Sequence, residues 1–276
     1  LTEVESHNFA LIFSIIIFQT EEKMKIIPLS EGTFTIDQSK KFQPFDLDKD
    51  VLTDRPQGSL LVEVQPFVVV TSKDILLLDT GLGFEINGKM QIHKNLIDGG
   101  INPSEVTKVL LSHLHKDHGG GVGYERDGLG ARLSFENASY FVQQKEFQYA
   151  FEKGFPSYTT QELEALKENE KVHLLDGDGV IDDYISYKVS GAHAPFHQVF
   201  WIRDEGDIVF YGGDEAPQLK QMKHRFVAKY DYDGKKAMEL RTAWWQQGMN
   251  EGWTFLFYHD VRNPLYECKK PDNAGL

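Results

Sequence analysis

Four side chains that could bind metal ions lie within the six-residue segment His113-Leu114-His115-Lys116-Asp117-His118. A short apolar run precedes this segment, and three glycines follow it. A chain that leaves a strand through a turn can direct alternate side chains at one point, which regular helix or strand spacing does not allow. Imidazole and carboxylate groups are ligands of zinc and similar divalent metals. The segment therefore predicts a metal centre in which His113 and His115 share one ion, while Asp117 and His118 face a second.

Five more ligand-type side chains follow apolar runs of strand length elsewhere in the chain. They are Asp79 after Ile75–Leu78, His193 and His197 after Tyr184–Val189, Asp214 after Ile208–Tyr211, and His259 after Thr254–Tyr258. Side chains at strand ends lie at the edge of a sheet, where sites are commonly found. A single histidine of this kind is more often a hydrogen-bonded core residue. Together, these positions indicate one shared site.

The composition limits the chemistry and the partners. The formal charge is −13, and the chain has no basic run, which argues against a nucleic-acid partner. A small neutral molecule is a better candidate for the substrate. The only cysteine, Cys268, cannot form a disulfide within one chain, so metal ligands must be histidines and carboxylates.

An apolar segment, Phe9–Phe18, lies near the N-terminus. Ten residues are too few for a membrane-spanning helix, which needs about 20. Glu3 and Glu5 precede the segment where a signal peptide would carry basic residues, which favours a cytoplasmic location over a secreted or periplasmic one. We expect no membrane span. We interpret residues 1–24 as an extension that packs as a buried strand. A lid or a contact within a homodimer is the functional alternative.

Short strands in antiparallel groups, separated by helices, dominate the rest of the chain. The expected strands are Leu60–Val64, Phe67–Thr71, Ile75–Leu78, Val109–Leu111, Tyr140–Val142, Tyr184–Val189, Val199–Ile202, Ile208–Tyr211 and Thr254–Tyr258. We expect helices to begin near Asn102, to cover Gln144–Glu170 with a break at Gly154–Pro156, and to cover Lys235–Gln247. This order favours a sandwich of two sheets with helices outside, built as a single domain over residues 1–276.

The motifs HLHKDH (113–118), DTG (79–81), GAHAPFH (191–197) and GGD (212–214), together with His259, resemble the metallo-β-lactamase superfamily. The resemblance covers Lys25–Asp260 and implies an α+β fold, a four-layer αββα sandwich of two mixed sheets. It implies two divalent metal ions, for which this donor set favours zinc. The implied ligands are His113, His115 and His193 for the first metal and Asp117, His118 and His259 for the second, with Asp214 bridging both. Asp79 and His197 match positions that orient ligands without touching a metal.

Within the superfamily, the chain looks most like the dizinc N-acyl-homoserine lactonases, in particular a Bacteroidetes-type branch of these quorum-quenching enzymes. The supporting stretches are residues 28–34, 111–118, 140–147 and 258–260. This resemblance implies opening of the lactone ring by a metal-bridging hydroxide, with Asp117 or Asp214 relaying a proton to the leaving oxygen. An organophosphate or aryl-ester hydrolase of the same fold is one alternative. An iron persulfide dioxygenase is an alternative from another class.

Two positions depart from the lactonase pattern. Pro217 stands where many of these lactonases have a tyrosine that contacts the substrate carbonyl, so this role is vacant or passes to another residue. Phe196 stands where a glycine is usual, and it would narrow the substrate pocket. We expect further apolar pocket walls from Trp244, Trp245, Met249 and Trp253, with core packing as the alternative for each tryptophan. Lys116, the non-ligand of the histidine motif, is expected to be solvated.

Overall fold

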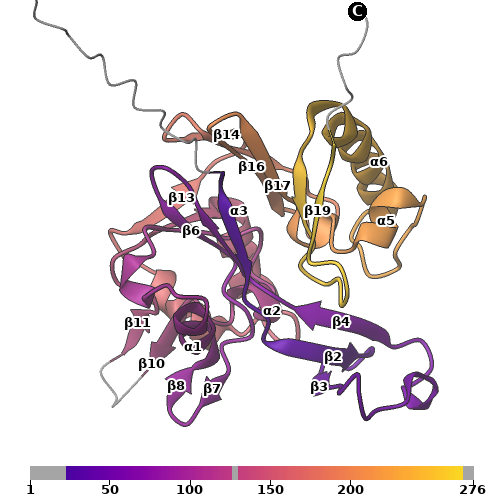
Figure 1. Ribbon diagram of the computed structural model, residues 1–276. Helices are drawn as coiled ribbons and strands as arrows, with labels where there is room; N and C mark the ends of the chain where they lie inside the picture. The colour runs from indigo at the N-terminus through magenta and orange to yellow at the C-terminus, as the bar shows by residue number, and fades with distance from the viewer. Residues whose placement is uncertain (1–22, 126–129, 270–276) are drawn as a thin grey trace, which may run out of the picture.

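Two six-stranded sheets face each other in the computed structural model, which describes residues 23–125 and 130–269 (Figure 1). The first sheet has the order β1 (Lys25–Pro28), β5 (Phe67–Val70), β6 (Ile75–Leu78), β9 (Lys108–Leu110), β12 (Ser139–Gln143) and β13 (Val172–Leu175). The second has the order β14 (Gly179–Ile181), β15 (Ile185–Val189), β16 (Gln198–Asp204), β17 (Asp207–Tyr211), β18 (Thr254–Leu256) and β19 (Leu265–Glu267). Both sheets contain parallel and antiparallel pairs, as a mixed sheet does.

Both faces of each sheet are covered, which explains why the strand sequences are apolar runs rather than alternating patterns. In β6, Leu76 and Leu78 pack toward the second sheet, whereas Leu77 packs in the layer under α1 (Gln91–Asp98) and α3 (Gln144–Lys153). In β17, Tyr211 packs between the sheets, whereas Phe210 faces α6 (Gly234–Glu251). Three apolar layers thus separate four layers of structure. The α+β class and the αββα sandwich expected from the sequence are confirmed.

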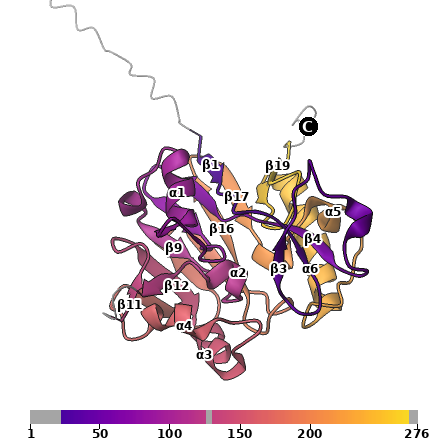
Figure 2. The same ribbon diagram turned by 90° about the horizontal axis from the view of Figure 1, so that it is seen from below.

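Smaller elements decorate this sandwich. They are the sheet β3 (Phe42–Pro44), β2 (Gly32–Ile36) and β4 (Leu60–Val64), the pairs β7 (Glu85–Ile86) with β8 (Lys89–Met90) and β10 (Gly123–Glu125) with β11 (Ala131–Leu133), and the short helices α2 (Lys116–Gly119), α4 (Thr160–Leu163) and α5 (Leu219–Lys223). Figure 2 shows α1, α3 and α4 on one side of the sheets and α5 and α6 on the other. The helix α2 lies between these two sides and carries half of the histidine motif.

Most strands expected from the sequence are present, and Leu60–Val64 and Ile75–Leu78 have the expected bounds. The helix expected from Asn102 is wrong, because only a single 3-10 turn, Pro103–Glu105, forms before β9 begins. Asn102 and Glu105 cap this turn reciprocally. The apolar segment Phe9–Phe18 lies outside the described residues. Within the described ranges, no helix is long and apolar enough to cross a membrane.

The strand directions gather the expected ligands at one edge. The strands β6 and β9 are parallel neighbours, so the loops that follow them, with Asp79 and the 113–118 segment, leave the first sheet side by side. The strands β17 and β18 are parallel neighbours in the second sheet, and Asp214 and His259 follow them. Each sheet therefore delivers its ligands from adjacent carboxyl ends, the usual position of a site in parallel sheets.

Candidate metal centre

A first cluster of ligand atoms forms around the histidine motif. His113 Nε2 lies 2.9 Å from His115 Nδ1, and His193 Nε2 lies 3.2 Å from the same His115 nitrogen. Asp214 Oδ2 is 3.2 Å from His193 Nε2. All four ligand atoms lie within 4.8 Å of one another. The structure thus brings together the four residues expected around a first metal.

A second cluster shares Asp214 with the first. Asp214 Oδ1 lies 3.1 Å from His118 Nε2 and 3.0 Å from His259 Nε2. Asp117 Oδ2 completes the group, 3.4 Å from His259 Nε2 and 3.7 Å from His118 Nε2. One carboxylate oxygen of Asp214 therefore faces each cluster, which is the arrangement required of a bridging ligand.

The donor atoms fit divalent metal ions in spacing and in chemistry. A tetrahedral zinc ion with nitrogen ligands at about 2.0–2.1 Å separates those nitrogens by about 3.3 Å, close to the distances within the first cluster. In addition, His118 Nε2 and Asp214 Oδ1 are buried and have no hydrogen-bond partner. Buried polar atoms without a partner are costly, so two such atoms aimed at the same point indicate that a cation belongs there.

The electrostatics of the cluster also favour added positive charge. Burial alone lowers the pKa of His118, but the carboxylates of Asp214 and Asp117 outweigh it and hold this pKa well above its usual range. Burial is likewise outweighed at His259, whose pKa rises to about 10 beside Asp214. In contrast, burial and the surrounding imidazoles keep the pKa of His113 well below its usual range. In the absence of metal, protons therefore collect at the carboxylate side of the site, where metal ions would replace them.

Asp79 is fully buried and contacts the ligand residue His118 rather than the space between the ligands. Its carboxylate accepts hydrogen bonds from the backbone N–H and hydroxyl of Ser112, at 2.7 and 2.6 Å, from His118 Nδ1 at 2.7 Å and from the Tyr211 hydroxyl at 2.5 Å. Four donors occupy both oxygens, so Asp79 is well placed to orient His118 and poorly placed to bind metal itself. Its φ of +55° is a left-handed conformation, which aspartate tolerates better than most residues.

His197 also lies beneath the clusters, and its ring is fully buried. Its Nε2 accepts a hydrogen bond from the backbone N–H of Asp214 at 3.2 Å, and its Nδ1 lies 3.1 Å from the Ser190 hydroxyl. Gly213 has a φ of +48°, and a Cβ atom there would meet His197 Nε2 at 2.8 Å. His197 thus contacts the backbone that presents Asp214, in agreement with the orienting role that the resemblance implies.

Several supporting residues were missed from the sequence because nothing local distinguishes them. Glu146 on α3 is fully buried and accepts hydrogen bonds from Leu114 N at 3.1 Å and from the Tyr158 hydroxyl at 3.2 Å. It thereby fixes the backbone between His113 and His115. The Glu63 carbonyl accepts a hydrogen bond from His259 Nδ1 at 2.6 Å.

The expected apolar wall of tryptophans is wrong. Trp244, Trp245, Met249 and Trp253 all pack in the core between α6 and the second sheet. Trp253 is fully buried against Phe210, at 5.5 Å between ring centroids. The 18-residue helix α6 must cover one face of this sheet, and its large apolar side chains are used for that purpose.

Phe196 lies near the site but does not point at it. Its ring packs on Tyr149 of α3, at 5.8 Å between centroids. Together with Tyr232 and Pro195, these two residues line a hollow of about 440 Å³. Phe196 therefore shapes a surface beside His193, rather than narrowing the space next to the metals.

Lys116 is partly exposed, as expected from the sequence, but its ammonium group also has protein contacts. Its ammonium group donates a hydrogen bond to the Lys40 carbonyl and lies 5.6 Å from the ring of Phe42 and 5.9 Å from that of Phe155. Lys40 in turn donates to the Ser157 hydroxyl at 2.5 Å. These contacts tie the β2–β3 hairpin to the histidine motif, so Lys116 helps to hold one wall of the site.

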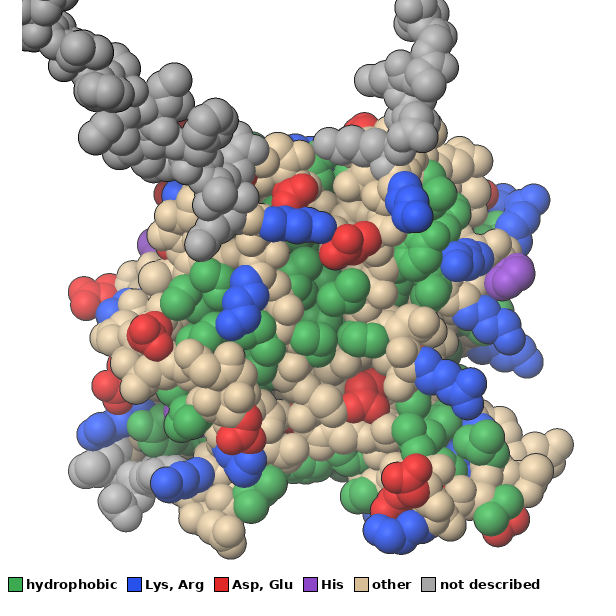
Figure 3. Space-filling view, in the orientation of Figure 1, with side chains coloured by type: hydrophobic (Ala, Val, Ile, Leu, Met, Phe, Trp, Pro, Cys, Tyr) green, Lys and Arg blue, Asp and Glu red, His purple; other side chains and the backbone are tan. Residues whose placement is uncertain are grey.

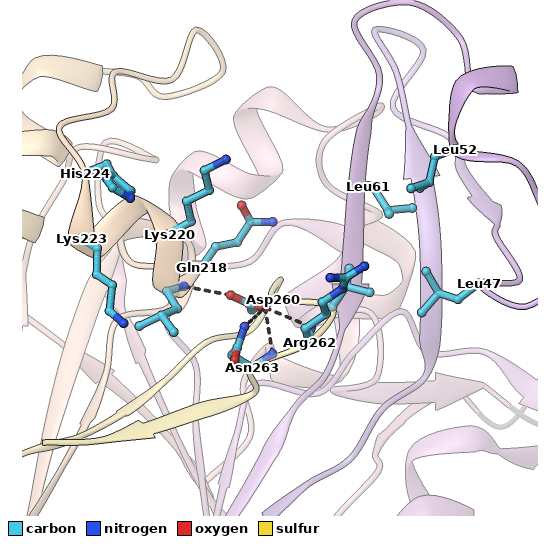
Figure 4. A pocket seen from close by; sticks show the side chains of 12 residues that line it. Leu47, Leu52, Leu61, Gln218, Lys220, Lys223, His224, Asp260, Arg262 and Asn263 are labelled. Atoms are coloured by element: carbon cyan, nitrogen blue, oxygen red, sulfur yellow. Dashed lines mark hydrogen bonds between the residues drawn. The ribbon is translucent and has the colours of Figure 1, made fainter.

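A second hollow, of about 470 Å³, lies behind the loop that carries His259. Figure 4 shows Leu47, Leu52 and Leu61 on one side of it, Lys220, Lys223 and His224 on the other, and Asp260 between them. Lys and Arg side chains gather on the same edge of the molecule, over α5 (Figure 3). The Asp260 carboxylate accepts hydrogen bonds from Leu219 N and Arg262 N, both at 3.0 Å, whereas His259 faces the metal ligands. The two sides of this loop therefore face different spaces.

Comparison with known proteins agrees with this geometry. The family described as "Metallo-beta-lactamase superfamily" matches residues 61–244. The chain belongs to this superfamily. An N-acyl homoserine lactonase, AttM, from Azorhizobium caulinodans is 31% identical over 115 residues, which cover 38% of each chain. The match thus spans well under half the length of that curated relative.

Solved structures share the fold over nearly the whole chain. A probable metal-dependent hydrolase from Staphylococcus aureus superimposes with a TM-score of 0.71 at 21% identity, covering 88% of this chain and 92% of that one. AidC, described as a dizinc quorum-quenching lactonase in complex with its product, gives a TM-score of 0.66 at 18% identity, covering 92% of each chain. These likenesses confirm the metallo-β-lactamase fold that the motifs indicate.

Proposed function

We propose that this protein is a dinuclear metal-dependent hydrolase that opens the lactone ring of N-acyl-homoserine lactones. The observation that carries the proposal is the position of Asp214, whose two oxygens face two separate clusters of ligand atoms. We assign His113, His115 and His193 to a first metal and Asp117, His118 and His259 to a second. Asp214 would bridge the two. The curated relative AttM and the structural neighbour AidC, both described as lactonases, support the substrate class.

Zinc is the metal that this donor set favours, since five imidazoles and two carboxylates match its preference for nitrogen and oxygen ligands. Two zinc ions, when bound, would supply Lewis acidity and lower the pKa of water to near neutrality. No thiolate takes part, because the single cysteine, Cys268, lies in the core cluster next to α6.

The side chains of the protein would then transfer protons and hold the ligands in position. The carboxylates of Asp117 and Asp214 are 12% and 10% exposed, so they reach the space where a substrate would enter. We assign to them the transfer of the proton that the attacking water loses and the leaving ring oxygen gains. Asp79 and His197 hold His118 and Asp214 in place while charge moves.

The role left vacant at Pro217 passes, in this proposal, to Tyr230. Pro217 is buried, and its carbonyl accepts a hydrogen bond from His259 N at 3.0 Å, so it belongs to the framework. Tyr230 lies 6.2 Å from the His193 ring, is 42% exposed and has its hydroxyl 3.1 Å from the Gln221 amide nitrogen. In contrast, the hydroxyls of Tyr211 and Tyr258 are buried and donate to protein acceptors. Tyr230 therefore has a partly exposed side chain whose ring lies next to His193, a residue of the first cluster.

A substrate panel tests the proposal. We expect the zinc-loaded protein to hydrolyse N-acyl-homoserine lactones with a kcat/KM far above its values for a phosphotriester and an aryl ester. The Tyr230→Phe variant should lose part of the lactone activity while keeping both metals. Rapid phosphotriester turnover without lactone hydrolysis would instead support the organophosphate hydrolase. Iron-dependent oxygen consumption with a persulfide would support the dioxygenase.

A further inference from the structure

The ring of His193 contacts a carboxylate through Nδ1, the nitrogen that does not face the ligand cluster. This carboxylate comes from a loop that is distant in the sequence. His193 Nδ1 lies 3.0 Å from Asp231 Oδ1. The Asp231 side chain is fully buried, and the His193 side chain is 7% exposed. Because an ionised carboxylate only accepts, Nδ1 carries a proton, and Nε2, which faces His115 and Asp214, is the nitrogen available to a metal ion. Asp231 therefore selects the tautomer in which His193 can bind a metal through Nε2.

The loop that carries Asp231 is bound to the same segment as His193. Tyr232 N donates to the His193 carbonyl at 3.1 Å, and Asp233 N donates to the Ala192 carbonyl at 2.7 Å. Asp233 also begins α6, since its carboxylate accepts a hydrogen bond from Lys236 N at 3.0 Å. These bonds fix the distance between Asp231 and His193 independently of any metal.

A buried arginine completes this support from α6. Arg241 is 1% exposed, and it donates to the carbonyls of Glu215 at 3.0 Å and Phe226 at 2.7 Å. Its Nη1 lies 3.8 Å from Asp231 Oδ2, an oxygen that has no hydrogen-bond partner. A buried carboxylate without compensation is costly, so the guanidinium offsets the charge of Asp231.

Glu215 binds the backbone of the segment that carries His193. Its Oε1 accepts hydrogen bonds from the backbone N–H groups of His193 at 2.8 Å and Ala192 at 2.7 Å, and from the Ser190 hydroxyl at 2.8 Å. Glu215 follows Asp214 directly, and its own carbonyl is bound by Arg241. Arg241 thus connects the segment that presents the bridging carboxylate with the loop that orients the third histidine.

We infer that Asp231 is a positioning residue for the first metal, acting through His193, with Arg241 as its anchor. This inference rests on the proposed function in taking His193 as a ligand. Partners that hold the second nitrogen of a ligating histidine typically change metal affinity 10–100-fold when they are removed. No motif near the other ligands contains Asp231, since it lies 17 residues beyond Asp214 in the sequence.

The test compares three variants in zinc affinity, measured by chelator competition on metal-free protein. We expect Asp231→Ala to weaken one of the two zinc sites by roughly 10–100-fold and to leave the other within a few-fold. Asp231→Asn should lose less, because its amide oxygen can still accept the Nδ1 hydrogen. The control is Asp233→Ala, which removes the α6 cap two residues away without touching the His193 ring, and should keep wild-type affinity at both sites.

A second readout follows the ring itself. At a pH high enough to leave the His193 ring neutral, the ¹⁵N shifts of the metal-free protein should show the Nδ1-protonated tautomer in the wild type and a mixture of tautomers in Asp231→Ala. If wild type binds two zinc ions and Asp231→Ala binds both with unchanged affinity, the positioning role is overturned while the proposed function stands. Equal losses in Asp231→Ala and Asp233→Ala would overturn it too, because they would indicate general destabilisation. A wild-type protein without metal affinity would overturn the proposed function and the role of Asp231 with it.

Discussion

Replacing Asp79 by alanine should damage both the stability of the protein and its second metal site. The change removes the acceptor of four buried donors, of which the Ser112 hydroxyl also lies 3.1 Å from His113 Nδ1. Three donors are then left without an acceptor, namely Ser112 N, the Tyr211 hydroxyl and His118 Nδ1. An unsatisfied buried donor costs about 1–3 kcal/mol, so three of them correspond to roughly 3–9 kcal/mol. We expect roughly 3–5 kcal/mol, the lower part of this range, because water can enter the space that the carboxylate leaves. This is a large part of a typical unfolding free energy of about 5–15 kcal/mol.

The Asp79→Asn variant removes the charge of the side chain but keeps the backbone conformation. Asparagine also tolerates the left-handed φ of +55° and keeps one carbonyl oxygen as an acceptor. It should therefore lose only about 1–2 kcal/mol of unfolding free energy, the cost of one or two unsatisfied donors. Both variants should bind the second zinc ion roughly tenfold or more weakly, because His118 loses the carboxylate that orients its ring.

Urea unfolding of the metal-free protein and chelator competition measure the two effects separately. Asp204→Ala is the matched control, since Asp204 binds the backbone N–H and hydroxyl of Ser72 as Asp79 binds those of Ser112. The control should lose stability and keep wild-type zinc affinity. If Asp79→Ala unfolds at the wild-type urea concentration, or if the control loses zinc affinity equally, the assignment of Asp79 is refuted.

Three further predictions concern pH, a close contact and the core. The pKa of His259 is raised from about 6.5 to about 10, so its proton stabilises the metal-free protein fully below about pH 6.5, and this contribution is lost toward pH 10. Zinc must displace that proton, so calorimetry in buffers of different ionisation enthalpy should show proton release at pH 7 and an affinity that rises with pH. Gly81→Ala should destabilise more than Gly58→Ala, because both glycines have positive φ, but only a Cβ at Gly81 would meet the Glu31 carboxyl, at 2.4 Å; equal unfolding free energies would contradict this. Trp244→Ala should cost about 3–5 kcal/mol of stability with little change in kcat/KM, whereas a selective loss of activity would return Trp244 to the substrate pocket.

The sequence was most informative for ligand-type residues that lie just after a strand. The ligand set could be predicted because each residue follows an apolar run directly, as Asp79 follows Ile75–Leu78. The family resemblance then ordered these residues into two groups, and the structure brings each group together. The two-sheet sandwich was equally accessible, since strands buried on both faces appear as continuous apolar runs.

Contacts between segments that are distant in the sequence could not be predicted in the same way. Asp231, Glu146 and Arg241 look like ordinary surface residues in the sequence, and only the packing of α3 and α6 against the site buries them. The tryptophans near His259 suggested a pocket because they are close in sequence. The direction of Trp244 and Trp245 depends on which face of α6 meets the sheet, and they lie on that face, whereas Trp253 follows the helix and packs in the same core.

One zinc titration can establish whether a two-metal centre in this protein opens acyl-homoserine lactones. Metal-free protein is titrated with zinc while the rate of N-acyl-homoserine lactone ring opening is followed by the acid it releases. Seven ligands divided three, three and one shared predict a rate that rises until two zinc ions per chain are bound and then stays constant. A plateau at one zinc ion per chain, or no ring opening at any zinc concentration, would contradict the account.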